Sequence, residues 1–200
     1  METVTAPLDE LAGTVLPLLG IGAIAAELAS QGVPAERLFE GTGLAASQLA
    51  DSSARISLRQ RLTLYENALK HSVRPDTALR AGMQRRLSDF GIFGYALASS
   101  ATLRDALKFA TAHLSLSGPT MHVRCRFEAE SVILSSHGFQ SLGPVLAFAA
   151  EFWRSSHVTL MSRVMEAPVP SRLMIFPTAP PRTGRRTNRC STARSSLSKA

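Results

Sequence analysis

The segment SDFGIFGYALASSATLRDALKFATAHLSLS, residues 88–117, decides the fold that we expect for this chain. Its first half is apolar and aromatic but contains Gly91 and Gly94, which indicates that another part of the chain packs close to the backbone there. Thr102 followed by Asp105 is typical of a capping box at the start of a second helix. The apolar residues after it recur at helical spacing. We therefore expect a helical hairpin with a buried face.

Upstream of this segment, the sequence predicts further helices. An apolar stretch over residues 15–32 predicts a first helix with Pro17 in its first turn. Residues 33–49 predict two shorter helices. Ser57 is expected to cap the next helix, and Pro75 to open another short one. The N-terminal part of the chain should thus be a mostly helical layer.

Downstream, the periodicity changes. Residues 121–127 alternate between apolar and polar, as a half-buried strand does, and residues 132–134 predict a second strand. A long apolar helix is expected over residues 144–165, followed by a third strand over residues 172–176. Together these patterns predict an α+β fold, in which a mostly helical N-terminal layer is combined with a small antiparallel sheet and a long C-terminal helix.

The opening segment resembles the signature of the N-terminal effector-binding, arabinose-binding-like domain of AraC-type transcriptional regulators. The matching positions are Asp89, Phe90, Gly91, Gly94, Tyr95, Ala96, Ser99, Ser100, Thr102, Leu103, Ala106 and Leu107. The resemblance implies a bacterial-type regulator domain that binds a small-molecule effector and forms a homodimer, or a mixed dimer with an intact relative. Full members also carry two C-terminal helix-turn-helix units. The resemblance therefore implies a truncated regulator without sequence-specific DNA binding of its own.

Charge is unevenly distributed along the chain. The formal net charge is +7, and after Phe176 there are six basic residues and no acidic ones. We expect a flexible N-terminus over residues 1–13, an effector-sensing domain over residues 14–177 and a disordered basic tail over residues 178–200. The tail has two further interpretations, as an arm through which a stand-alone basic protein binds nucleic acid nonspecifically, or as the product of a frameshift near its start.

The sequence shows neither a targeting signal nor a functional cysteine pattern. No apolar run reaches the roughly 18 residues of a membrane span, and the first 13 residues carry no Lys or Arg for a signal peptide. We therefore expect a soluble cytoplasmic protein without membrane contact. Two cysteines are too few for a disulfide framework or a metal cluster, and Cys125 is expected to be a buried thiol.

No catalytic or metal-binding pattern stands out in the sequence. The five histidines lack metal-ligand spacing, and a nucleophile elbow and a phosphate-binding glycine loop are both missing. We therefore expect no enzyme, no cofactor and no metal. Aromatic rings with polar tips are side chains that can line small-molecule pockets, although each taken singly is more often a core residue than a ligand contact. On this basis the candidates for a ligand pocket are Tyr65, Phe90, Tyr95, His113 and Trp153.

Overall fold

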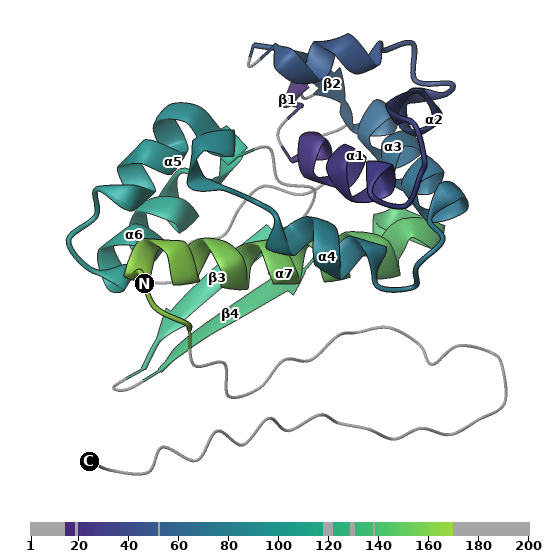
Figure 1. Ribbon diagram of the computed structural model, residues 1–200. Helices are drawn as coiled ribbons and strands as arrows, with labels where there is room; N and C mark the ends of the chain where they lie inside the picture. The colour runs from purple at the N-terminus through teal and green to yellow at the C-terminus, as the bar shows by residue number, and fades with distance from the viewer. Residues whose placement is uncertain are drawn as a thin grey trace, which may run out of the picture.

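The structure is a computed structural model (Figure 1), and it describes residues 15–18, 20–51, 53–117, 122–128, 131–137 and 139–169. The predicted flexible N-terminus, the predicted strand over residues 172–176 and the predicted basic tail lie outside the described residues.

The described elements confirm the α+β class. The N-terminal part contains β1 (Val15–Pro17), α1 (Ile21–Ala29), α2 (Ala35–Phe39), the 3-10 helix η2 (Ala46–Ala50), β2 (Arg55–Ser57), α3 (Leu58–His71) and α4 (Thr77–Met83). The hairpin contains η3 (Leu87–Phe90), α5 (Gly91–Ala98), α6 (Leu103–Ala112) and η4 (Leu114–Ser117). The C-terminal part contains β3 (His122–Phe127), β4 (Val132–His137), η5 (Phe139–Val145) and α7 (Leu146–Met165).

The prediction of one helix over residues 15–32 is wrong, because the stretch begins as a strand. Leu16 pairs with Ile56 in an antiparallel two-stranded sheet, and both side chains are buried. Gly20 then adopts φ 84° and begins α1, a conformation that glycine reaches without strain. The Arg85 guanidinium occupies the space that a Cβ at Gly20 would need. Pairing with a distant strand thus overrides the local helical spacing of the apolar residues.

α7 connects the two halves of the domain. Figure 1 shows it running past α4, with α5 and α6 near its C-terminal end. Gly82 allows α4 to approach α7 closely, because a Cβ there would lie 2.6 Å from the Phe152 carbonyl oxygen. The helix was expected from residue 144. The chain is instead a 3-10 helix up to Val145 and α-helical from Leu146.

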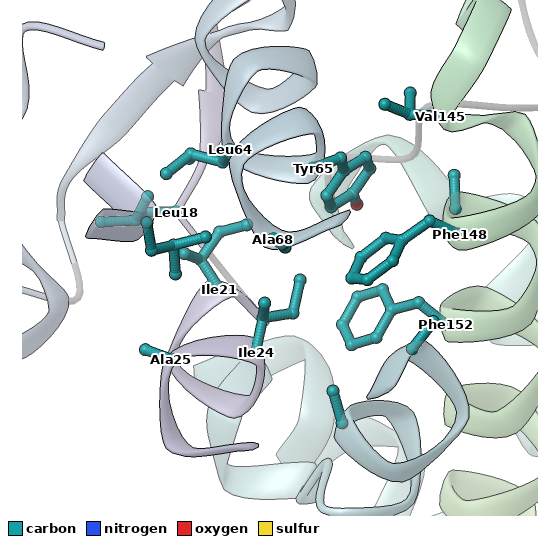
Figure 2. Close-up of a cluster of buried hydrophobic side chains, with 14 of the residues drawn as sticks. Leu18, Ile21, Ile24, Ala25, Leu64, Tyr65, Ala68, Val145, Phe148 and Phe152 are labelled. Carbon is teal, nitrogen blue, oxygen red and sulfur yellow. The ribbon is translucent and has the colours of Figure 1, made fainter. Parts of the chain in front are cut away.

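The main core lies between the N-terminal layer and the first half of α7. Figure 2 shows side chains of α1 and α3 facing Phe148 and Phe152 of α7. The Tyr65 ring lies 5.8 Å from the Phe148 ring and 6.2 Å from the Phe152 ring, measured between centroids. Such tilted aromatic pairs add packing energy beyond the area they bury.

The helical hairpin of residues 88–117 is confirmed. The Asp105 backbone N–H donates to the Thr102 hydroxyl at 3.1 Å, which caps α6. A Cβ at Gly94 would collide with the Leu87 carbonyl, so this glycine permits the close packing that was predicted. Gly91 is needed for a different reason, because its φ is 53°.

The two predicted strands after the hairpin pair with each other. β3 and β4 are antiparallel, with Cys125 opposite Leu134, and β4 extends beyond the predicted residues 132–134. Val123 and Cys125 are buried while Arg126 is exposed, as the alternation predicted. Arg154 of α7 donates to the Leu134 carbonyl at 3.3 Å. This hydrogen bond connects the β3–β4 hairpin to α7.

Candidate functional site

A cavity of about 90 Å³ lies between the second half of α7 and the α5–α6 hairpin, reaching back to α3 and to Arg85 just after α4. Among the described residues it is lined by Arg61, Tyr65, Arg85, Phe90, Phe93, Leu97, Leu103, Ala106, Leu107, Ala110, Leu114, Ser117, Phe152, Trp153, Ser156, His157, Leu160, Met161 and Val164. Most of these side chains are aliphatic or aromatic, so the cavity is a mainly apolar space with a few polar groups.

One wall of the cavity comes from α7, between Phe152 and Val164. The aliphatic wall on the other side comes from α6, over residues 103–110.

Two buried arginines lie at the end of the cavity next to the main core. Arg61 is 3% exposed and Arg85 is 4% exposed. Arg61 donates a hydrogen bond to the Pro17 carbonyl. The Arg85 guanidinium lies over the Phe90 ring, 4.2 Å from its centroid, and its Nε is 3.7 Å from a carboxylate oxygen of Asp89. No acidic residue is among the described residues that line the cavity.

Burial makes both positive charges less favourable than they are in water. It lowers the pKa of Arg61, and it lowers the pKa of Arg85 to about 10, with Asp89 partly opposing the shift. Arg61 itself contributes to the lower pKa of Arg85, because two like charges disfavour each other. With a pKa of about 10, Arg85 remains protonated at neutral pH, so this end of the cavity is cationic.

Aromatic and imidazole groups complete the polar end. The Trp153 indole N–H donates to the Tyr65 hydroxyl, and burial raises the pKa of Tyr65. One turn further along α7, the His157 Nδ1 lies 2.8 Å from the Trp153 carbonyl oxygen. Burial lowers the pKa of His157 to about 4, so the ring is neutral at pH 7. A neutral ring bonded in this way carries its proton on Nδ1 and keeps Nε2 as an acceptor.

Three of the five predicted pocket residues line the cavity, namely Tyr65, Phe90 and Trp153. Tyr95 is 74% exposed. It lies two residues from the buried Phe93, and two helical residues are separated by about 200° around the axis. His113 is absent from the described lining and stacks on Phe109, with ring centroids 4.6 Å apart.

The sequence reasoning did not select Arg61, Arg85 or His157. A signal existed for two of them, because Arg61 precedes Tyr65 by four residues and His157 follows Trp153 by four. Residues at that spacing share a helix face, so each polar residue lay on the same face as a selected aromatic one. For Arg85 the sequence held no such signal, because adjacent basic residues such as Arg85 and Arg86 are equally typical of an exposed loop.

Metal chemistry and membrane insertion find no support in the described part of the chain. No group of three or more His, Cys, Asp or Glu side chains there has the arrangement to hold a metal ion. No helix within the same residues is both long enough and apolar enough to span a membrane.

Comparison with known proteins identifies two relatives of this chain. The chain is 32% identical over 96 residues to an uncharacterised HTH-type transcriptional regulator of Mycobacterium bovis and, to the same extent, to one of Mycobacterium tuberculosis. Each match covers 46% of this chain and 27% of the relative, so the chain spans about a quarter of the relatives' length. No solved structure matches it.

A family model described as the arabinose-binding domain of AraC transcription regulator, N-terminal, matches residues 32–191. This range includes every described residue that lines the cavity. The chain belongs to the family of N-terminal arabinose-binding domains of AraC transcription regulators.

Proposed function

We propose that this domain is the ligand-sensing part of an AraC-type transcriptional regulator and that the cavity between α7 and the α5–α6 hairpin is its effector site. The observation that carries the proposal is the position of the cavity within the family match, between elements from both halves of the domain. A ligand there contacts α3, Arg85 just after α4, the hairpin and α7 at once. Its binding therefore favours one arrangement of these elements over another.

The effect on transcription is proposed to pass to a helix-turn-helix domain of the kind that the relatives' names describe. Ligand binding stabilises one relative position of the hairpin and α7, and a DNA-binding domain or a second copy in contact with these elements then experiences a different surface. On this proposal the domain supplies ligand dependence, as a homodimer or in a mixed dimer, and performs no chemistry.

A matched pair of substitutions on α6 tests the site. Ala110 lines the cavity, whereas Ala112 is exposed on the same helix. Ala110→Phe places a ring in the cavity, and Ala112→Phe places the same ring in solvent. We expect small molecules that slow amide hydrogen exchange in α6 and α7 of the wild-type chain to act equally on Ala112→Phe and to lose their effect on Ala110→Phe. Unchanged protection in Ala110→Phe would place the ligand elsewhere and refute the proposed site.

A further inference from the structure

We infer that the effector is an apolar carboxylate, with its carboxylate group beside Arg61 and Arg85 and its apolar part between α6 and α7. The inference rests on the proposal that this cavity is the effector site, and it adds the chemical class of the ligand. It follows from three features of the cavity, which are its charge, its mainly aliphatic walls and its shortage of free hydroxyl groups.

Charge points to an anion. Two guanidinium groups border a mainly apolar space that has no acidic residue among its described lining. The nearby carboxylate of Asp89 is 34% exposed and lies 3.7 Å from the Arg85 Nε. That Nε makes no hydrogen bond in the described part of the chain. A buried charge is tolerated when it is paired, and the planar fork of arginine matches the two oxygens of a carboxylate. An anionic ligand therefore completes this end of the cavity.

The walls of the cavity point to an apolar ligand body. Beyond the arginines the walls are mainly aliphatic, including Leu103, Leu107 and Met161. Such walls match a chain of methylene groups.

The hydroxyl groups of the cavity argue against a sugar, although arabinose gives the family its name. Ser117 and Ser156 donate to the Leu114 and Phe152 carbonyls, at 2.8 Å and 2.6 Å. The Tyr65 hydroxyl already accepts from Trp153. A pentose presents hydroxyl groups around its whole ring, and each one buried without a partner opposes binding. The mainly aliphatic walls offer few such partners.

Trp153 provides the measurement, because it lines the cavity and is the one tryptophan of the chain. Its fluorescence is recorded while the full chain is titrated with butyrate, hexanoate, octanoate and decanoate, with the primary amide of each length, and with L-arabinose. We expect saturable binding of at least one acid, at least tenfold weaker binding of the amide of the same length, and no response to arabinose.

Variants then assign the carboxylate. Arg85→Met should weaken binding of the best acid at least tenfold, while Arg126→Met on the exposed edge of β3 should leave it unchanged, since Arg126 is 68% exposed. Ala110→Phe gives a second variant. Its ring fills the part of the cavity beside α6 that is proposed to hold the apolar part of the ligand, and it leaves both arginines in place. Circular dichroism confirms that each variant is folded.

The outcomes separate this inference from the proposed function. Equal binding of acid and amide, or full acid binding by Arg85→Met, overturns carboxylate recognition while leaving a sensing cavity. Saturable binding of arabinose that Ala110→Phe abolishes also overturns the inference and supports the site. If no acid binds, the effector class is wrong. If the hydrogen-exchange test with the α6 pair fails as well, the effector site itself is wrong.

Discussion

Replacing Arg85 with methionine should stabilise the ligand-free domain. The Arg85 side chain is almost fully buried, and burial lowers its pKa to about 10. A lowered pKa on a basic group means that folding disfavours its charged form. The penalty is present in full at pH 7, and it is relieved only as the pH rises through the folded pKa towards the unfolded one. Methionine has a similar shape and carries no charge.

The magnitude follows from opposing contributions. The lowering of the Arg85 pKa to about 10 corresponds to about 3 kcal/mol against the charged form. The contacts of the guanidinium with the Phe90 and Phe152 rings, at 4.2 Å and 5.7 Å, return about 1–2 kcal/mol. The net gain for Arg85→Met is therefore about 1–2 kcal/mol, within the range found when buried ionic groups are replaced by apolar ones. For a chain of this length the gain raises the melting temperature by about 4 °C.

Urea and thermal unfolding of the full chain at pH 7, followed by circular dichroism, measure this gain. Arg126→Met is the matched control, because Arg126 is exposed and pairs with the exposed Glu128, and it should change stability by less than about 0.5 kcal/mol. A loss of about 1 kcal/mol or more in Arg85→Met would refute the reasoning. Such a loss would show that the contacts of the guanidinium stabilise the domain by more than the cost of burying its charge, and that Arg85 stabilises the fold.

Three further predictions concern the same structure. His157 has its pKa lowered to about 4 by burial, with Arg154 and Arg85 adding to the shift. The unfolded chain therefore binds this proton first as the pH falls, and stability should drop by about 2 kcal/mol between pH 7 and pH 4.5. Urea midpoints at the two pH values measure the drop, and it should shrink in His157→Gln. Glu27 is buried, and its carboxylate accepts hydrogen bonds from Gln31 just after its own helix and from Arg80 and Gln84 at α4 and its end. Glu27→Ala should cost about 2–3 kcal/mol in urea unfolding, and a cost below about 1 kcal/mol would mean that water replaces these bonds. Gly82→Ala forces α4 away from α7 and should lower the melting temperature. Gly22→Ala, in a helix with free space around it, should raise stability by up to about 1 kcal/mol, and a gain in both variants would contradict the close approach at Gly82.

Local sequence signals predicted the elements that depend on neighbouring residues. The caps at Ser57 and Thr102 were recognised because the capping side chain and its partner lie within one turn. The alternation before Phe127 predicted β3 because side chains of a strand point to opposite faces in turn. The mistake at Leu16 has the same origin, since its strand exists only through pairing with residues some forty positions later.

The cavity was partly foreseen from residue types. Tyr65, Phe90 and Trp153 were selected as aromatic groups with a place in a pocket, and all three line the cavity. The selection of Tyr95 used the same reasoning, yet this residue faces solvent. Residue type alone does not say which face of a helix is buried. The ligand-binding role of the selected residues stays a prediction until the fluorescence titrations are made.

The sequence by itself determined the family, through the spacing of residues 88–117, and the local elements, through caps and periodicity. Only the tertiary structure decided the chemistry of the cavity. In the sequence Arg61 and Arg85 are ordinary helix and loop arginines, and their charge becomes distinctive because folding removes both from water beside the same mainly apolar cavity. The energy of a charge depends on the groups that surround it, and here those groups come from helices far apart along the chain.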